Sequence, residues 1–252
     1  MEKVNLLAVH HYPTDYLDDI YQCPDCRDTG YIGQEKCHCF QQHILDVLYD
    51  QSNLRELVRT ENFRHFRLDY YSERPERQGC PSPRENMREI LARCRRFIDT
   101  FEAVPGDNLL ISGNTGVGKT FLANCIAAEL LEKGHSVIYM TAHQFFSELA
   151  DYTFRRNQGN SDTLTFLLNC DLLIIDDLGT ELNNGFINSQ LFLCINERIL
   201  HRKSTIISTN LSLKQLSQAY TERISSRFIE SYEYFHIYGE DIRIKKAVSS
   251  LD

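Results

Sequence analysis

The amino-acid sequence predicts an α/β fold in which helices flank a parallel five-stranded sheet. Short apolar segments rich in Ile, Val or Tyr alternate with segments whose apolar residues have helical spacing, which is typical of a parallel sheet wrapped by helices. A glycine-rich loop also follows the first strand and opens a helix, as phosphate-binding loops do. The five strands are expected at Asn108–Ser112, Ser136–Thr141, Asp171–Asp176, Ser204–Thr209 and Tyr234–Tyr238.

Two of the intervening helices have clear ends. Thr120–Lys133 has apolar residues at helical spacing and is stopped by Gly134. Asn188–Arg202 has the same spacing, with basic residues in its last turn. Both helices are therefore expected to pack against the sheet.

The chain is expected to have three parts. Residues 1–40 are turn-rich, carry four of the cysteines and have too little apolar content to fold without a metal or a neighbouring domain. Residues 41–104 read as a helical linker region with Arg-rich faces, interrupted by an exposed loop at Glu73–Pro83. Residues 105–252 form the α/β domain.

The composition excludes several classes of protein. With 252 residues and 42% hydrophobic content, the chain can bury a sizeable core. No apolar run approaches the ~20 residues of a membrane helix, and Met1–Tyr12 lacks the pattern of an export signal, so we expect a cytoplasmic protein. Nine cysteines, an odd number, favour reduced thiols or metal ligands over a disulfide framework. A net charge of −8 argues against a protein that coats nucleic acid by bulk electrostatics, so any DNA contact must be local.

The glycine-rich loop predicts a binding site for the phosphates of ATP. Its glycines let backbone N–H groups surround the β-phosphate, Lys119 reaches the β- and γ-phosphates, and the Thr120 hydroxyl binds Mg²⁺. The alternative, a plain Gly-rich turn, does not explain why a strand precedes the loop and a helix follows it. The nucleotide-binding residues of this loop are Gly113, Asn114, Thr115, Gly116, Val117, Gly118, Lys119, Thr120 and the following Phe121.

An acidic pair ends the third predicted strand. Asp176 follows a buried apolar run and is expected to hold the Mg²⁺ beside the phosphate loop, although two acids after a strand can also form a surface turn. Asp177 takes the position at which such ATPases usually carry a glutamate that polarises the attacking water. Because aspartate is one methylene shorter, we expect slow hydrolysis or help from Glu181.

Three polar residues farther along the chain are candidate catalytic groups. Asn210 ends the fourth strand and can orient the attacking water, or it can be a turn residue. Arg223 and Arg227 lie four residues apart on one helical face. That face is either solvated or presents Arg227 as an arginine finger to the ATP of a neighbouring subunit.

Together these residues resemble the AAA+ ATPases of the DnaC/DnaI helicase-loader group and the related IstB transposition ATPases. The resemblance covers about residues 20–245 and is most specific at Cys23–Tyr31, Ser52–Leu54, Glu61–Phe66, Ile175–Glu181 and Glu222–Phe228. It implies that Asn210 is the sensor-1 residue, Arg227 the finger and Arg243 the sensor-2 arginine, which contacts the γ-phosphate. The chain stops nine residues after Arg243 (252 − 243), so no C-terminal helical lid is expected.

The resemblance also implies the biological role. It is the ATP-dependent delivery of a replicative helicase onto single-stranded DNA, with self-assembly through the Arg227 face. One alternative is an IstB-like ATPase that presents target DNA to a transposase. Another is a small-molecule P-loop kinase, which would leave the two arginines Arg223 and Arg227 unexplained.

The spacing Cys23-x2-Cys26-x10-Cys37-x-Cys39 predicts a structural zinc site. A metal would supply the folding free energy that this poorly apolar segment lacks. Free thiols and an iron–sulfur cluster are the alternatives. His38 is a weaker candidate ligand.

Candidate DNA contacts lie beyond the second strand. The aromatic residues Phe145 and Phe146 and the basic residues Arg155 and Arg156 could combine base stacking with phosphate contacts. A helix with a core-facing aromatic pair and a solvated basic end explains them equally well.

Overall fold

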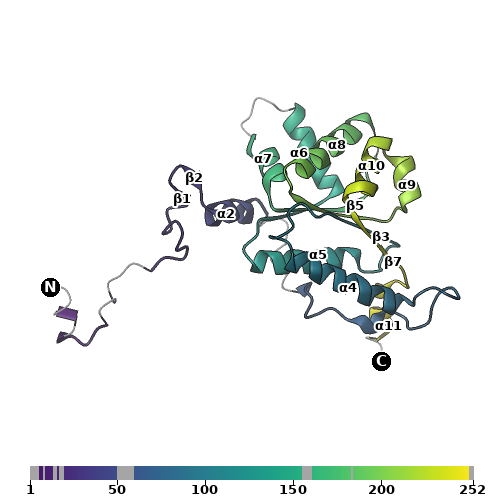
Figure 1. Ribbon diagram of the computed structural model, residues 1–252, viewed down its shortest axis with the longest axis horizontal. Coiled ribbons are helices and arrows are strands. Elements are labelled where there is room, and N and C mark those ends of the chain that lie inside the picture. Colours follow the sequence, from purple (N-terminus) through teal and green to yellow (C-terminus); the bar gives the residue numbers. More distant parts are fainter. Residues whose placement is uncertain are drawn as a thin grey trace. The chain divides into compact units, whose positions relative to one another are not determined.

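The structure of the protein, a computed structural model, consists of two compact units, Met1–Leu48 and Tyr49–Asp252 (Figure 1). It describes residues 6–7, 9–13, 16, 20–49, 60–154, 161–182 and 184–249. The Ser52–Leu54 motif and Arg155 and Arg156 lie outside these residues. Within the described ranges, none of the helices combines the length and the apolar character that a membrane span requires.

The smaller unit contains a short hairpin followed by a helix. β1 (Tyr31–Ile32) pairs antiparallel with β2 (Glu35–Lys36), and α2 (His38–Tyr49) begins two residues later. Its described buried cluster consists of cysteine side chains alone: Cys23, Cys26 and Cys37, with Cys39 packed against them. Because three buried thiols are a small core, this unit needs a further source of stability.

Five parallel strands form the sheet of the larger unit, in the order β4-β5-β6-β3-β7. Each predicted strand is confirmed, with ends that differ by at most two residues. Because all neighbouring strands are parallel, their carboxyl ends meet at one edge of the sheet. The strands are β3 (Leu109–Gly113), β4 (Val137–Thr141), β5 (Leu172–Leu178), β6 (Ser204–Thr209) and β7 (Glu233–Ile237).

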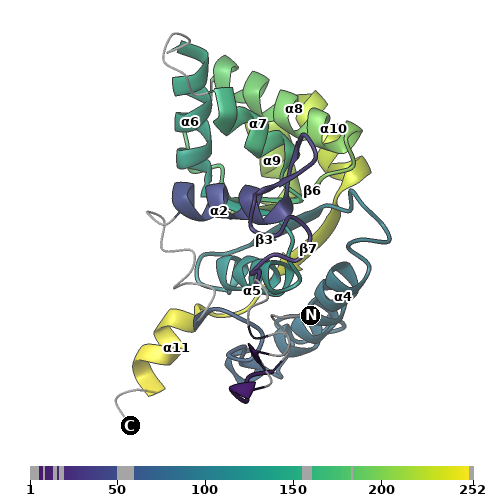
Figure 2. The same cartoon turned by 90° about the vertical axis from the view of Figure 1, so that its left-hand side faces the viewer.

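Helices cover both faces of this sheet, as Figure 1 and the rotated view in Figure 2 show. On one face lie α4 (Pro83–Asp99) and α5 (Lys119–Glu132), with η2 (Leu68–Tyr70) against α4 and α11 (Ile242–Ser249) on the same side. On the other face lie α6 (Ala142–Phe154), α7 (Ser161–Asn169), α8 (Gly185–Leu200), α9 (Leu213–Ala219) and α10 (Glu222–Ser231).

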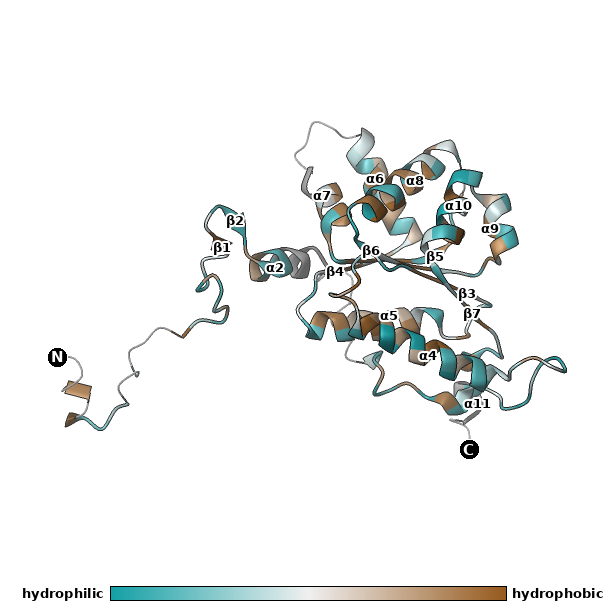
Figure 3. Ribbon diagram, viewed as in Figure 1, coloured by the Kyte–Doolittle hydropathy of each residue, from teal (hydrophilic) through white to brown (hydrophobic). Residues whose placement is uncertain are grey.

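Helix α4 comes from the region that the sequence suggested as a linker, and it packs into the main core. A capping box between Ser82 and Glu85 fixes its start, with Pro83 in the first turn. Its apolar side, which includes Met87 and Phe97, is buried with α5 and the strands. Figure 3 shows the resulting pattern, with apolar residues in the strands and in α5 and polar residues on the outer side of α4.

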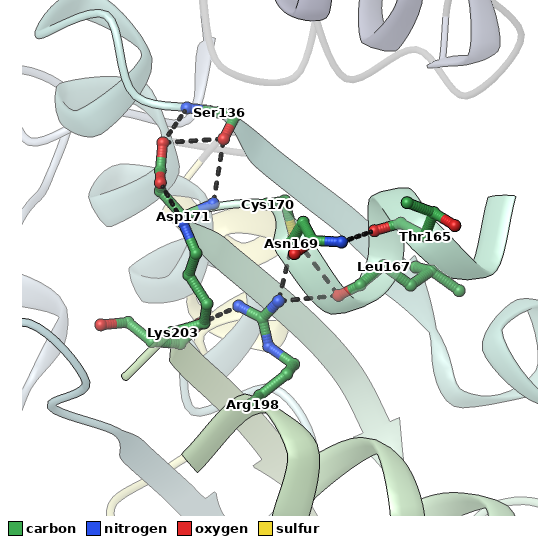
Figure 4. A network of polar contacts seen from close by, with 9 residues as sticks. Ser136, Thr165, Leu167, Asn169, Cys170, Asp171, Arg198 and Lys203 are labelled. Carbon is green, nitrogen blue, oxygen red and sulfur yellow. Dashed lines mark hydrogen bonds and ion pairs between the residues drawn. The ribbon is translucent and has the colours of Figure 1, made fainter. Parts of the chain in front are cut away.

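A polar network at the amino ends of the strands includes the fully buried Arg198 of α8 (Figure 4). The Arg198 guanidinium donates to Leu167 O at the end of α7 (2.7 Å) and to Ser204 O (2.5 Å) and Thr205 Oγ1 (3.0 Å) at the start of β6. Beside it, the Asp171 carboxylate accepts hydrogen bonds from Ser136 and Lys203. This network joins the elements at the edge opposite the phosphate loop.

Candidate nucleotide-binding site

The predicted phosphate loop connects β3 to α5 at the carboxyl edge of the sheet. Gly113 and Gly118 have φ angles of 155° and 100°, which disfavour any side chain. A Cβ atom on Gly113 would lie 2.2 Å from Ile237 O, and one on Gly118 would lie 2.7 Å from Tyr71 Oη. Glycine is therefore required at both positions, and the loop and first turn of α5 together line one cavity.

Lys119 is the first residue of α5, and its side chain is only 5% exposed. Its Nζ donates to Gly113 O (2.9 Å), Asn114 O (2.9 Å) and Asn210 Oδ1 (2.6 Å). Burial lowers the pKa of Lys119, and the nearby acids Asp177 and Asp176 oppose that shift. Because the ammonium has only neutral hydrogen-bond acceptors among the described residues, it is prepared to bind an anion such as phosphate.

Asp176 lies near the carboxyl end of β5, and its side chain is 2% exposed. Its Oδ2 accepts hydrogen bonds from Thr120 Oγ1 (2.9 Å) and Tyr139 Oη (2.6 Å), and its Oδ1 accepts one from Ser208 Oγ. Carboxylate and hydroxyl oxygens are ligands that Mg²⁺ prefers. Asp176 and Thr120 lie together and beside the phosphate loop, so these two residues fit a Mg²⁺ ion.

The pairing of β5 with β6 is irregular at Asp177. The register shifts between Ile175 and Leu178, and Asp177 itself has a φ angle of 57°. Its N–H donates to Ser208 Oγ (2.9 Å), and its side chain lines the cavity. Burial raises the pKa of Asp177, and the negative charge of Asp176 raises it further. The strand thus continues past the expected end at Asp176 and presents Asp177 to the cavity.

Glu181, the suggested substitute for Asp177, has other partners. Its carboxylate accepts hydrogen bonds from Tyr220 Oη and from Gly179 N (2.9 Å). It is not among the described residues that line the cavity. Its suggested role in hydrolysis stays a prediction.

The predicted sensor residues also line the cavity. Asn210 follows β6, and its side chain accepts the hydrogen bond from Lys119 already described. Arg243 lies in the first turn of α11, is exposed and faces the cavity together with Ile242. The Ile242 N–H donates to Gly116 O (2.9 Å), so α11 begins in direct contact with the phosphate loop.

The cavity has a volume of about 420 Å³, and one of its walls was missed by the sequence reasoning. This wall comes from residues 61–71, before α4. Tyr71 Oη donates to Val117 O (2.9 Å), and the ring of Phe66 packs edge-on against that of Phe121 (5.9 Å between centroids). The Glu61–Phe66 motif was the signal in the sequence, but its spacing does not reveal a ligand-binding wall. The wall consists of Glu61, His65, Phe66, Arg67, Tyr70 and Tyr71.

Arg227 and Arg223 lie on α10, outside this cavity. They line a separate surface hollow with Phe192 of α8. The Arg227 side chain is 38% exposed and forms an ion pair with Glu230 (3.5 Å). Neither arginine lines the cavity of its own chain, so a role in hydrolysis would require a neighbouring subunit.

The four predicted cysteine ligands come together in the smaller unit. The sulfur atoms of Cys23, Cys26, Cys37 and Cys39 all lie within 4.8 Å of one another, with Cys23–Cys37 at 3.7 Å and Cys26–Cys39 at 3.3 Å. Two sulfurs on a tetrahedron around zinc, with zinc–sulfur bonds of about 2.3 Å, are about 3.8 Å apart. The Cys23–Cys37 distance agrees with that value and the Cys26–Cys39 distance is somewhat shorter, so the four thiols fit a tetrahedral metal site.

Neighbouring groups also influence the acidity of this cluster. Burial raises the pKa of Cys26, but hydrogen bonds from Cys39 and other groups outweigh it and lower the pKa to about 7. The same hydrogen bond raises the pKa of Cys39, and the pKa of Cys37 is raised as well. Metal binding requires thiolates, so it would release protons from these two residues. The His38 ring lies 3.9 Å from Cys23 Sγ and 3.5 Å from Cys37 Sγ, but it also pairs with Asp25 (3.6 Å).

The aromatic pair suggested for DNA contact belongs to the core. Phe145 is fully buried and Phe146 is 6% exposed, and their rings pack edge-to-face. Buried rings cannot stack on bases. The hypothesis that these two residues contact DNA is therefore wrong.

The sequence of this chain is similar to those of known ATP-binding proteins. The model of a family described as IstB-like ATP binding protein matches residues 89–250. The replicative helicase loader DnaC of Escherichia coli strain K12 is 27% identical over 181 residues, which are 71% of this chain and 67% of the relative.

Solved structures with a similar fold include DnaC and DnaI. A crystal structure of the DnaC helicase loader has a TM-score of 0.56 and 25% identity, and the match covers 72% of this chain and 98% of that one. A structure of DnaI has a TM-score of 0.58 and 22% identity over 73% of this chain and 94% of that one. The sheet and its flanking helices thus match the P-loop fold of AAA+ proteins.

Proposed function

Because the chain belongs to the family of IstB-like ATP-binding proteins, we propose that it is an ATPase that loads a replicative helicase onto single-stranded DNA. One observation is the main support for this proposal. A single cavity is lined by the lysine of the phosphate loop, the acid Asp177, the amide Asn210 and Arg243. The resemblance to DnaC supports the choice of a helicase as the partner.

In this proposal the phosphate loop holds the phosphates of ATP, and Lys119 exchanges its neutral acceptors for the β- and γ-phosphate oxygens. Thr120 and Asp176 would hold Mg²⁺, which neutralises phosphate charge when bound. The wall of residues 61–71 also lines the cavity and would offer its aromatic rings to the base of the nucleotide. Ile242 and Arg243 bring α11 to the same ligand.

Hydrolysis would depend on residues from two subunits. Asp177 and Asn210 would orient the attacking water within one chain, and the short side chain of Asp177 would slow the reaction. Arg227 of a neighbouring chain would stabilise charge on the γ-phosphoryl group. The surface position of Arg227 on α10, with its side chain 38% exposed, supports this assignment, because a finger must be able to reach another subunit.

The smaller unit is proposed to bind zinc through its four cysteines. A closed four-thiolate site is typical of structural zinc. In such a small unit the metal would supply most of the folding free energy. The unit would then be available to bind another protein, for which the helicase is the proposed candidate.

Calorimetry with Mg²⁺ and ATP tests the nucleotide site. The wild-type protein should bind ATP, and Lys119→Ala should lose about 3 kcal/mol or more of binding free energy, because charge-assisted hydrogen bonds contribute about 1.5–3 kcal/mol each. The matched control is Lys214→Ala, an exposed lysine of α9, which should bind like the wild type. Equal affinity for Lys119→Ala and the wild type would reject the site.

A loading assay tests the partner. The protein, ATP and the replicative helicase of the same organism are mixed with single-stranded DNA coated by its binding protein, and helicase bound to DNA is measured. The proposal expects ATP-dependent loading that Lys119→Ala abolishes. Absence of any helicase complex, together with ATP-dependent stimulation of a transposase, would favour the second candidate function, assistance to DNA transposition, which the family match also supports.

A further inference from the structure

Two hydroxyl groups hold the Asp176 carboxylate from opposite sides, and neither has a role in the function proposed so far. Tyr139 Oη donates to Asp176 Oδ2 (2.6 Å), and Ser208 Oγ donates to Asp176 Oδ1. Neither Tyr139 nor Ser208 is among the described residues that line the nucleotide cavity. We call these two residues the hydroxyl clamp.

The sheet topology explains how the clamp forms. Asp176 is on β5, Tyr139 is on the neighbouring strand β4, and Ser208 is on β6, the strand on the other side of β5. The Tyr139 ring packs against the main hydrophobic core, which fixes the direction of its hydroxyl. Ser208 is fully buried and also accepts the Asp177 N–H (2.9 Å), so it supports both acids at the irregular end of β5.

The chemistry of the clamp suits a carboxylate that must bind a cation. Asp176 is almost fully buried, so its charge needs hydrogen bonds to replace those of water. A lysine or arginine partner would neutralise that charge, whereas hydroxyl groups orient the carboxylate and leave it negative. Burial raises the pKa of Tyr139, and the charge of Asp176 adds to the shift, so the hydroxyl keeps the proton that it donates.

Thr120 is the third hydroxyl on Asp176 and donates to the same Oδ2 as Tyr139 (2.9 Å). In the proposed function Thr120 would bind Mg²⁺ through a lone pair of its oxygen, which leaves its proton for Asp176. Tyr139 and Ser208 would support Asp176 without contacting the metal. Partners of this kind around metal ligands typically contribute about 10- to 100-fold to metal affinity.

We propose that Tyr139 is a positioning residue that, with Ser208, orients Asp176 toward Mg²⁺ and so sets the Mg²⁺ requirement of nucleotide binding. This inference rests on the proposed ATP site. It assigns Tyr139 and Ser208 no contact with the nucleotide itself.

The test measures binding of a fluorescent ATP analogue to the full chain by anisotropy, at increasing Mg²⁺ concentration and in EDTA. Tyr139→Phe should raise the Mg²⁺ concentration for half-maximal binding by about 10-fold or more, while affinity in EDTA stays unchanged. The matched control is Tyr238→Phe, which removes a hydroxyl that donates to Pro81 O (2.9 Å) and has no carboxylate as a hydrogen-bond partner among the described residues. The control should have the Mg²⁺ dependence of the wild type.

Ser208→Ala removes the other hydroxyl of the clamp, and its Mg²⁺ dependence is measured in the same way. It replaces Tyr139→Phe if thermal unfolding shows that Tyr139→Phe does not fold. An unchanged Mg²⁺ dependence in a folded clamp variant, with normal Mg²⁺-dependent binding by the wild type, would overturn this inference and leave the ATP site intact. A weaker affinity in EDTA would also overturn it, because the residue would then support the loop and not the metal. A wild-type protein that binds no nucleotide would refute both proposals.

Discussion

Replacing the buried Arg198 by methionine should destabilise the larger unit. Methionine keeps much of the side-chain length and the helix propensity, but it cannot donate hydrogen bonds. Arg198 donates to Leu167 O (2.7 Å), Ser204 O (2.5 Å) and Thr205 Oγ1 (3.0 Å), and its Nη1 lies 3.3 Å from Cys170 Sγ. In the described part of the chain no carboxylate forms an ion pair with Arg198. Its hydrogen bonds to these neutral groups therefore offset most of the cost of burying its charge.

The magnitude follows from the acceptors that lose their donor. Leu167 O and Ser204 O become unsatisfied in a buried region, at about 1–3 kcal/mol each. Part of this loss is recovered, because a buried charge no longer has to be desolvated and Leu167 O keeps the contact with Cys170 Sγ (3.6 Å). We therefore expect a loss of about 2–4 kcal/mol in the free energy of unfolding. For a unit of this size, a loss of 3 kcal/mol lowers Tm by about 6–12 °C.

Urea denaturation followed by circular dichroism measures this change. The midpoint should fall with an unchanged m-value, since the unfolded surface is the same. Arg88→Met, on the exposed side of α4, is the matched control and should stay within about 0.5 kcal/mol of the wild type. A loss below about 1 kcal/mol for Arg198→Met would refute the reasoning, because the desolvation cost of the guanidinium would then equal what its hydrogen bonds contribute.

Two further predictions concern assembly and metal. Arg227→Ala should bind ATP normally but lose about 10³–10⁵-fold of the stimulated hydrolysis rate, and mixing it with Lys119→Ala protein should restore part of the activity, measured as phosphate release. Failure of mixing to rescue hydrolysis under conditions where the wild type assembles would exclude the role in trans, and Arg223→Ala should be tested in the same way. The purified protein should carry about one zinc per chain, and the double change of Cys23 and Cys26 to serine should release it without loss of ATP binding. Metal analysis that finds no zinc, or zinc unaffected by the double change, would contradict the site.

Local patterns in the sequence determined the sheet and the phosphate loop. The five strands were predictable because strands buried on both faces are continuous apolar runs bounded by turns, a signal that lies within each segment. Gly113, Gly118 and Lys119 were predictable for a similar reason: the conformation of the loop requires those residue types at that spacing. The cysteine spacing likewise predicted four sulfur atoms close together, which the structure contains.

Only the tertiary structure decided which side chains support these groups. Tyr139 and Ser208 lie 37 and 32 residues from Asp176, and they meet it because β4 and β6 flank β5. Nothing local distinguishes Tyr139 from any other aromatic residue of a strand. Phe145 and Phe146 were assigned to DNA contact but lie in the core. The sequence could not decide this, because an aromatic pair on a helix has the same local pattern whether it faces a ligand or the core.

The wall of residues 61–71 was hidden for the same physical reason. Its aromatic residues have the composition of an ordinary core segment, and Tyr71 becomes part of the site only by reaching Val117, 46 residues away. The left-handed conformation of Asp177 also depends on a distant strand, since the shift in pairing with β6 imposes it. The sequence by itself therefore determined the strands, the loop and the ligand types, through patterns within single segments. The packing of distant segments decided the orientation of Asp176, the cavity wall and the direction of Asp177, because those depend on contacts that form only when the sheet is assembled.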